Sequence, residues 1–316
     1  MLTPIKIGVS SCLLGNLVRY DGGHSHDRFL TQTLGLFTEY VPVCPEVECG
    51  MPTPRDSLRL VGDPENPRLV TRKTGEDHTE QMHSWIQKKL PALEKENLCG
   101  FIFKSKSPSS GLYRIKVYGD DGKVRSNGTG LFAKAFTRHF PRIPVEEAGR
   151  LNDPKLREHF IENIFSFQRW RRFLEDSPTL GKLVAFHTEN KLLILSHSQE
   201  IYRQMGKLVA RGKQIPPAEL FEAYEKLLLK ALDLKTTLKK NINVLQHAMG
   251  FFKKDLTRDE KQELLSSFSQ YRDGYVPLIV PLTLIKHYVL KYDQPWLKSQ
   301  TFLHPHPFEL KLRNYF

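Results

Sequence analysis

The residues best suited to chemistry are cysteines and carboxylates that follow short apolar segments. Cys44 and Glu46 come directly after the run 38–43, and Pro45 between them cannot donate a hydrogen bond to a sheet ladder. The β-branched residues of this run therefore predict a strand that ends at Cys44. In open α/β folds, ligands bind at the carboxyl ends of the strands, so we expect a thiol and a carboxylate together at such an edge.

Two other segments are built in the same way. Residues 5–9 are mostly apolar and lead into Cys12, while residues 100–104 lead into a serine-rich loop over 105–111. We expect these three strand ends to converge on one site. Soft ligands from three separate loops suit zinc, or an iron–sulfur cluster with one iron left open as a Lewis acid.

The cysteines themselves favour this view. All four (Cys12, Cys44, Cys49 and Cys99) lie in the first third of the chain. Cysteines clustered in a cytosolic protein are more often metal-binding or catalytic than disulfide-forming. The alternative is that they are simply small buried apolar residues.

Length and composition indicate a globular protein of two domains. The chain has 316 residues, of which 40% are hydrophobic and 26% charged. No apolar run approaches the roughly 20 residues needed to span a bilayer. The first residues enter a strand-like segment with a single Lys6, which does not resemble a secretory signal. We therefore expect a cytoplasmic protein with no membrane partner.

The net charge of +12 is unevenly distributed along the chain. Residues 151–316 carry 26 basic and 18 acidic groups, against 21 and 17 in residues 1–150. This excess favours a polyanionic partner, RNA or DNA, although an ordinary solvated surface would give the same count. The candidate phosphate contacts are Arg203, Lys207, Arg211, Lys213, Lys239, Lys240, Lys253 and Lys254.

Strands alternate with helices as far as residue 149, which predicts a small Rossmann-like α/β domain. Helical periodicity is found over 26–35, about 80–95 and about 131–140, and Thr79 could cap the second of these helices. The segment 127–130 contains Gly128 and opens the third helix. A glycine-flanked helix start suits an anion, although a tight turn explains the same pattern.

Residues 150–316 are predicted to form an all-helical domain. A linking helix covers 150–175, and further helices are expected near 181–212, 217–248 and 257–270, with a last one to about 292. The spacing of His187, His197, His247 and His287 fits no metal-ligand motif, so we expect packed or surface side chains there.

Several ordered motifs resemble a known family. Ser-x-Cys-Leu-Leu-Gly, Arg-Tyr-Asp-Gly-Gly, Cys-Pro-Glu-Val, Pro-Arg, Thr-Gly-x-Asp-x-Thr and Lys-x-Ser-Pro-Ser-x-Gly occur here in that order. Together they resemble the thiouracil desulfidase family. The second half is similar to the helical domain often fused to it, through motifs such as Pro-Leu-Ile-Val-Pro over 277–281. The fused form resembles bacterial tRNA 4-thiouridine desulfidases.

The resemblance implies a [4Fe–4S] cluster held by three cysteines, with Cys12 and Cys44 as two of its ligands. It also implies that Glu46 is the acid/base that activates water, and that Ser107 hydrogen-bonds the substrate or the transferred sulfur. The remaining candidate substrate-binding residues are Ser10, Ser11, Arg55, Asp77, Ser109 and Gly128. A surface salt bridge would explain Arg55 equally well, and helix capping would explain Asp77.

The chain departs from the family at one position. The third cysteine of the family falls at Ser110, and a hydroxyl is a harder and far less acidic ligand than a thiol. Ser110 could ligate weakly or mark an exchange of cysteine for serine. Cys49, or less readily Cys99 at the far end of its strand, could supply the missing thiolate. In the third alternative, the cluster is lost and the chain only binds nucleic acid.

The favoured hypothesis is an enzyme that converts 4-thiouridine in tRNA to uridine and sulfide without net redox change. A cluster-less nucleic-acid-binding protein is the main rival. Hydrolysis of free thiopyrimidines is the other alternative, in which the helical domain would be structural.

Overall fold

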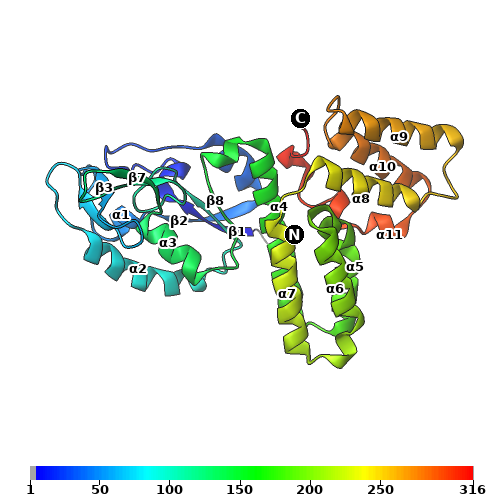
Figure 1. The fold of residues 1–316 in the computed structure, drawn as a ribbon, viewed down its shortest axis with the longest axis horizontal. Helices are drawn as coiled ribbons and strands as arrows, with labels where there is room; N and C mark the ends of the chain where they lie inside the picture. Colours follow the sequence, from blue (N-terminus) through cyan, green and yellow to red (C-terminus); the bar gives the residue numbers. More distant parts are fainter. Residues whose placement is uncertain (1–4, 316) are drawn as a thin grey trace. The chain divides into compact units, whose positions relative to one another are not determined.

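The computed structural model describes residues 5–315, and these residues divide into two compact units at Phe160/Ile161. The first unit is mixed α/β and the second is helical (Figure 1). Both observations confirm the predicted fold class. Among residues 5–315, no helix combines the length and the apolar composition needed to cross a membrane.

A four-stranded parallel sheet forms the base of the first unit. Its order is β2 (Thr38–Val43), β1 (Ile5–Ser10), β5 (Gly100–Phe103), β8 (Val145–Glu147). Ser10 pairs with Val43 in register, and Val9 pairs with Ile102. The carboxyl ends of β1, β2 and β5 therefore lie at one edge of the sheet, as the sequence predicts.

A second sheet has the order β4 (Arg68–Thr71), β3 (Leu58–Val61), β6 (Ile115–Tyr118), β7 (Val124–Gly128). Only its β3–β6 pair is parallel. Helices α2 (Thr79–Glu94) and α3 (Leu131–His139) share one apolar core with strands of both sheets (Figure 1). Phe101 and Phe103 of β5 lie at its centre, within ring contact of Phe132 and Phe136 of α3.

One local expectation in this unit holds only in part, and another is wrong. The helical segment expected at 26–35 is a π turn at Phe29–Thr33 followed by a 3-10 turn at Leu34–Leu36. Thr79 does not cap α2, because His78 occupies the N-cap position. The Thr79 hydroxyl instead accepts the backbone N–H of Leu69 at 2.8 Å, which ties α2 to β4.

The remaining elements are short turns in the first unit and the helices that follow. The turns are Ser11–Leu14, α1 (Pro45–Glu48) and Arg150–Asn152. The helices are α4 (Pro154–Glu175), α5 (Leu180–His197), α6 (Gln199–Ala210), α7 (Pro217–Asp233), α8 (Leu238–Gly250), α9 (Arg258–Arg272), α10 (Ile279–Lys291) and α11 (Pro295–Lys298). Further 3-10 turns cover Gly212–Gln214, Thr301–Leu303 and Phe308–Leu310.

The long helices expected over 181–212 and 217–248 are each two helices. Ser198 breaks the first, and its side chain accepts the N–H of Ile201 at the start of α6. Thr237 does the same for Lys240 at the start of α8. Hydroxyl side chains stabilise helix N-termini by accepting such orphan N–H groups, so both breaks have a local cause.

Buried charges hold the helical unit together. Glu162 of α4 accepts hydrogen bonds from His197 Nε2 at 2.7 Å and from an Arg313 Nη at 2.9 Å, and all three side chains are buried. His197 Nδ1 lies 2.6 Å from the carbonyl oxygen of Leu234, so both ring nitrogens have a partner. Burial by itself would raise the pKa of Glu162, but His197 and Arg313 hold it well below its usual range.

We expect Glu162→Gln to lower the free energy of unfolding by about 3–5 kcal/mol, because it removes the buried carboxylate that pairs with the Arg313 guanidinium. Since the pKa of Glu162 is depressed on folding, its stabilisation is full above the unfolded pKa, about 4.3, and is lost as pH falls below it. Denaturant unfolding at neutral and acidic pH measures both effects. Glu189→Gln, on the exposed side of α5, is the control and should change little.

Candidate functional site

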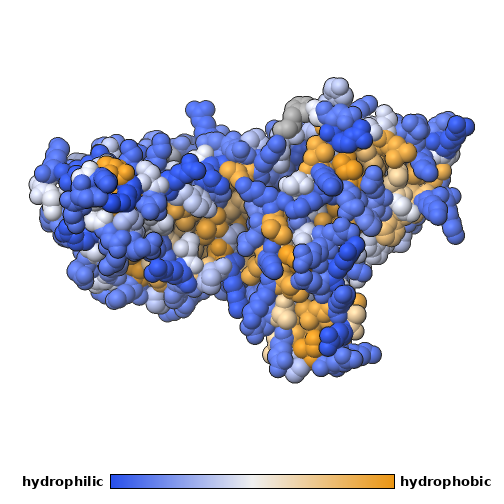
Figure 2. All heavy atoms as spheres, viewed as in Figure 1, coloured by the Kyte–Doolittle hydropathy of each residue, from blue (hydrophilic) through white to orange (hydrophobic). Residues whose placement is uncertain are grey.

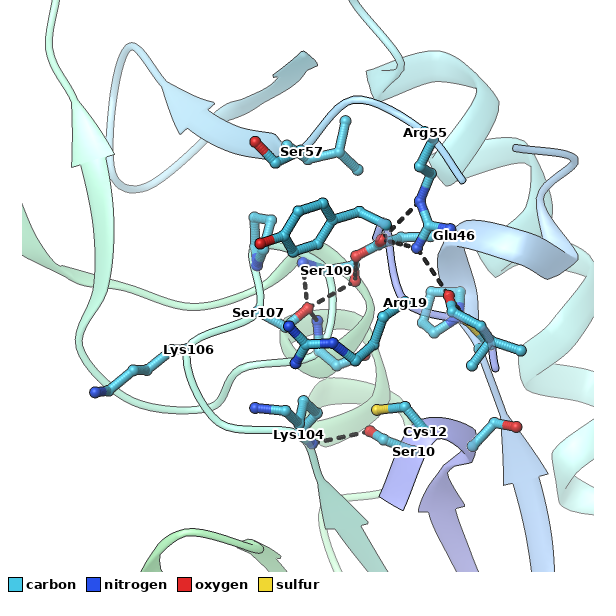
Figure 3. Close-up of a pocket in the computed structure, with 18 of the residues that line it drawn as sticks. Ser10, Cys12, Arg19, Glu46, Arg55, Ser57, Lys104, Lys106, Ser107 and Ser109 are labelled. Atoms are coloured by element: carbon cyan, nitrogen blue, oxygen red, sulfur yellow. Dashed lines mark hydrogen bonds and ion pairs between the residues drawn. The ribbon is translucent and has the colours of Figure 1, made fainter. Parts of the chain in front are cut away.

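A cavity of about 330 Å³ lies where the ends of β1, β2 and β5 meet (Figure 3). It is lined by residues from all three loops that the sequence singles out. These are Ser10, Ser11 and Cys12 after β1, Cys44 and Glu46 after β2, and Ser107, Ser109 and Ser110 after β5. Arg55, which precedes β3, also lines it. The expected convergence of three strand ends is therefore present in the structure.

The loop after β1 is fixed by one hydrogen bond to the end of β5 and by a tight turn. Ser10 Oγ accepts the N–H of Lys104 at 2.9 Å, which joins the end of β1 to the end of β5. Cys12 lies in the turn Ser11–Leu14, which ends at Gly15 with a left-handed φ of 95°. Since residues other than glycine rarely adopt such a φ, Gly15 allows the chain to leave the cavity directly after Cys12.

Cys44 and Glu46 are positioned by α1. Cys44 is the N-cap, Pro45 occupies the first turn, and the carboxylate of Glu48 accepts the N–H of Cys44 at 2.8 Å. Proline suits this position because it has no N–H to leave unpaired. The tight turn holds Cys44 and Glu46 on the same cavity wall.

The serine loop is fixed to the start of α3. Phe132 N–H donates to the carbonyl oxygen of Ser109 at 2.9 Å, and Leu131 N–H donates to that of Pro108 at 3.2 Å. A Cβ on Gly130 would lie only 2.5 Å from the backbone of Ser109, so a glycine is needed at this contact. The first N–H groups of α3 therefore donate to the serine loop. They are not free to bind an anion, as the glycine-flanked helix start had suggested.

Two predicted substrate-binding residues lie elsewhere. Gly128 is buried in β7, where a Cβ would meet Val117 and the backbone of Ile115. Asp77 accepts the N–H of Thr79 at 2.9 Å and pairs with Arg68 at 3.4 Å. Within the described residues 5–315, neither Gly128 nor Asp77 lines the cavity, so the structure gives no support to a substrate contact by either.

Glu46 is held by a network from two sides (Figure 3). Arg55 Nε donates to Glu46 Oε2 at 3.1 Å, and an Arg55 Nη forms a close ion pair with the same oxygen. Ser109 Oγ donates to Glu46 Oε1 at 2.8 Å and lies 3.0 Å from Ser107 Oγ. The guanidinium is nearly buried, at 6% exposure of its side chain, so the pair is screened little by water. Both oxygens of the Glu46 carboxylate are thereby oriented.

The two cysteines of the cavity are free thiols with raised pKa values. Burial raises the pKa of Cys12 to about 11, although Lys104 and Arg19 lower it. Burial also raises the pKa of Cys44. Both groups are therefore protonated at neutral pH unless a metal displaces the proton, as metal ligation by thiols requires.

Ser110 lines the same cavity as Cys12 and Cys44 and occupies the position of the third family cysteine. It is 4% exposed, lines the cavity, and donates its backbone N–H to Ser107 Oγ at 3.1 Å. Cys49 lies at the other end of α1 from Cys44, and its thiol donates to the carbonyl oxygen of Glu46 at 3.2 Å. Cys99 precedes β5, at the opposite edge of the sheet. Neither cysteine lines the cavity among residues 5–315, so neither replaces the missing thiol in this conformation.

At the three positions where the family has cysteines, the cavity therefore has two thiols, Cys12 and Cys44, and the hydroxyl of Ser110. Within the described ranges, no group of three His, Cys, Asp or Glu side chains could hold a metal ion. A deprotonated hydroxyl can ligate iron, although less well than a thiolate. Cys12, Cys44 and Ser110 line the same cavity, so two sulfur donors and one oxygen donor are available there to a cofactor.

Sequence reasoning missed the cations of the cavity. Arg19, Arg72, Lys104 and Lys106 all line it, and their positive charges favour an anionic cofactor or product. The available signals were Arg19 in the Arg-Tyr-Asp-Gly-Gly motif and the lysines that flank Ser105. Tyr20 and Ser57 also line the cavity and were missed.

The candidate phosphate contacts are spread over the helical unit. Arg203 and Lys207 lie on α6, Arg211 and Lys213 follow it, Lys239 and Lys240 begin α8, and Lys253 and Lys254 follow α8. Lys240 is engaged locally, since its ammonium donates to the carbonyl oxygen of Lys235 at 2.8 Å.

In the comparisons with known proteins, two family models match separate parts of the chain, one in each compact unit. A family model described as 2-thiouracil desulfurase matches residues 7–148, and one described as a protein of unknown function, DUF1722, matches residues 191–307. The uncharacterized protein YbgA of Escherichia coli K12 is 30% identical over 165 residues, which are 52% of this chain and 98% of that protein. The uncharacterized protein YbbK of Bacillus subtilis 168 is 32% identical over 150 residues, 46% of this chain and 97% of that protein. A solved structure of a [4Fe-4S]-dependent thiouracil desulfidase, TudS, is 31% identical, with a TM-score of 0.39, over 47% of this chain and 94% of its own.

Proposed function

This chain belongs to the thiouracil desulfidase family, in a form fused to a helical domain, and on that premise we propose that it hydrolyses 4-thiouridine in tRNA to uridine and sulfide. The single observation that carries the proposal is the cavity in which Cys12, Cys44 and Ser110 meet the oriented carboxylate of Glu46. Residues 1–149 would form the catalytic domain, and residues 150–316 the RNA-binding domain.

The cofactor that suits this cavity is a [4Fe–4S] cluster held by Cys12, Cys44 and Ser110. When bound, such a cluster supplies an iron without a protein ligand, a soft Lewis acid suited to a thiocarbonyl sulfur. Arg19, Lys104 and the other cavity cations would offset the negative charge of the cluster and of the departing sulfide.

Glu46 is the proposed acid/base. Its carboxylate accepts a proton from the water whose oxygen forms the new bond to C4 of the base, and it returns that proton to the departing sulfur. The second water proton leaves the hydroxyl on C4 when the new carbonyl forms, and it also passes to the sulfur. One water is thus consumed, C=S becomes C=O, hydrogen sulfide is released, and no external electrons are needed. Arg55 and Ser109 keep the carboxylate aimed, and Ser107 supports Ser109.

Arg55 is a positioning residue in this scheme, and we expect Arg55→Met to lower kcat by roughly 10²-fold with little change in KM. Methionine keeps an unbranched, flexible side chain, although a shorter one, and removes the ion pair with Glu46. Steady-state kinetics with the reconstituted protein measures the split. If KM rises about as much as kcat falls, Arg55 binds the substrate instead, which is the other role that we considered.

The excess of basic groups in the helical part supports tRNA as the substrate. The test is anaerobic reconstitution followed by incubation with 4-thiouridine-containing tRNA, monitored by the thionucleoside absorbance. We expect that absorbance to fall. The rate constant per bound substrate should be higher for tRNA than for free 4-thiouracil. Equal efficiency for both would favour a desulfidase of free thiopyrimidines. An iron-loaded protein that leaves the absorbance of both substrates unchanged would refute the proposal.

Ser110 specifically favours one other candidate, a nucleic-acid-binding protein without a cluster. That protein would bind tRNA in a salt-dependent manner and would remain colourless and free of iron after reconstitution. Iron content therefore separates the two functions directly.

A further inference from the structure

A groove of about 470 Å³ lies between α5 and α6. From α5 it receives Leu180, Val184, His187 and Lys191, spaced three to four residues apart on one helical face. From α6 it receives Arg203 and Gly206, and Lys213 in the following turn also lines it. All of these residues belong to the helical unit, far along the chain from the cysteines.

The charge of the groove is entirely positive. Lys191, Arg203 and Lys213 line it, and no Asp or Glu does so within the described part of the chain. None of these three cations forms a hydrogen bond or an ion pair with the other residues that the structure describes. Unpaired cations that line a common groove favour an anionic ligand.

A buried polar atom points to the same ligand class. His187 is 3% exposed, its Nδ1 lies 3.2 Å from the hydroxyl of Tyr224, and its Nε2 has no partner among residues 5–315. Burial and the charge of Lys191 lower the pKa of His187 to about 4, so the ring is neutral. In the tautomer in which the buried Tyr224 hydroxyl donates to Nδ1, Nε2 carries an unused N–H donor.

The rest of the groove is apolar and open. Leu180 and Val184 line it, and Val184 is 44% exposed. A Cβ placed on Gly206 would meet nothing within 4 Å, so space remains above α6. Figure 2 shows hydrophobic residues exposed between charged ones along the lower part of the α5–α7 helices. A ligand with an anionic part and a flat apolar part would match this surface.

We propose that this groove binds an RNA strand, with a phosphate between Lys191, Arg203 and Lys213 and the adjoining nucleoside against Leu180 and Val184. The proposal rests on the proposed function for its choice of RNA, and it adds Lys191 and His187 to the predicted contacts. Phosphate contacts of this kind give affinity without sequence specificity, which suits an enzyme whose chemistry occurs in another domain.

The test is titration of the full chain into labelled poly(U) of about 20 nucleotides at several salt concentrations. We expect Arg203→Glu and Lys213→Glu each to weaken binding about tenfold or more and to reduce the salt slope by about one. Gly206→Leu fills open space, and should weaken binding without changing the slope. Lys230→Glu, an exposed change on α7 outside the groove, is the matched control and should change neither value by as much.

Binding of unmodified RNA requires no turnover, so this test does not depend on the desulfidase activity. Equal effects of Lys213→Glu and Lys230→Glu would overturn the proposal, because they would show a diffuse charge effect. Competition by polyglutamate as strong as that by poly(U) would also overturn it, because the groove would then respond to charge alone. An unchanged affinity of Gly206→Leu would exclude the nucleoside contact.

Discussion

Glu46→Gln should lower kcat for desulfurisation by roughly 10²–10⁴-fold, the range expected for loss of a general acid/base. Glutamine has nearly the same shape and can still accept the hydrogen bond of Ser109, which is 2.8 Å long in the native protein. It cannot accept a proton from water, and it leaves the guanidinium of Arg55 without its anion. The variant should therefore bind substrate but turn it over very slowly.

The measurement is single-turnover loss of thionucleoside absorbance, with iron content determined on the same sample. Glu39→Gln is the control, because Glu39 lies on β2 with an exposed side chain and does not line the cavity. We expect native turnover from Glu39→Gln and native iron content from both variants. A Glu46→Gln protein that keeps its iron and at least half of its turnover would remove Glu46 from the proton transfer.

Ser110→Cys should increase the retention of iron and sulfide by at least roughly tenfold under a chelator, since even the partners of metal ligands change affinity 10–100-fold. Ser110 is buried at the cavity, beside loops that carry two thiols, so a cysteine there would complete a three-thiolate set. Thiolates hold iron better than hydroxyls because they are softer and more acidic. The rate of bleaching of the cluster absorbance measures the change.

Ser57→Cys is the matched control for this exchange, because it adds a thiol to the same cavity from the segment before β3. It should leave the bleaching rate close to that of the native chain. If Ser110→Cys and the native chain lose iron at the same rate, residue 110 is not a ligand. If Ser57→Cys protects as well as Ser110→Cys, any added thiol suffices and the assigned position is wrong.

The strand ends could be predicted because each carries an explicit local signal. β2 begins and ends at the predicted residues 38 and 43, where Pro45 cannot continue a ladder. Parallel strands place their carboxyl ends at one edge, so Cys12, Cys44 and Ser110 could be grouped without coordinates. The helical class of the second unit follows from periodicity, but its breaks at Ser198 and Thr237 depend on caps that periodicity does not show.

The rest of the site depends on contacts between residues distant in sequence. Arg55 meets Glu46 through the loop before β3, a contact that the sequence does not show. From the sequence alone, Arg55 could bind the substrate or form a surface salt bridge. Gly128 was predicted to bind substrate because it lies close to the start of a helix. The first N–H groups of that helix, however, donate to the carbonyl oxygens of Pro108 and Ser109. Cys49 is near Cys44 in sequence, yet one turn of helix carries its thiol to the far side of Glu46.

The central claim is that Cys12, Cys44 and Ser110 together hold an iron–sulfur centre beside Glu46. Its most direct test is the iron and acid-labile sulfide content of the anaerobically reconstituted chain, compared with the Cys12→Ser/Cys44→Ser double variant. The account predicts one [4Fe–4S] cluster per native chain and its loss in the double variant. Equal iron and sulfide in both proteins, or none in the native chain, would contradict it.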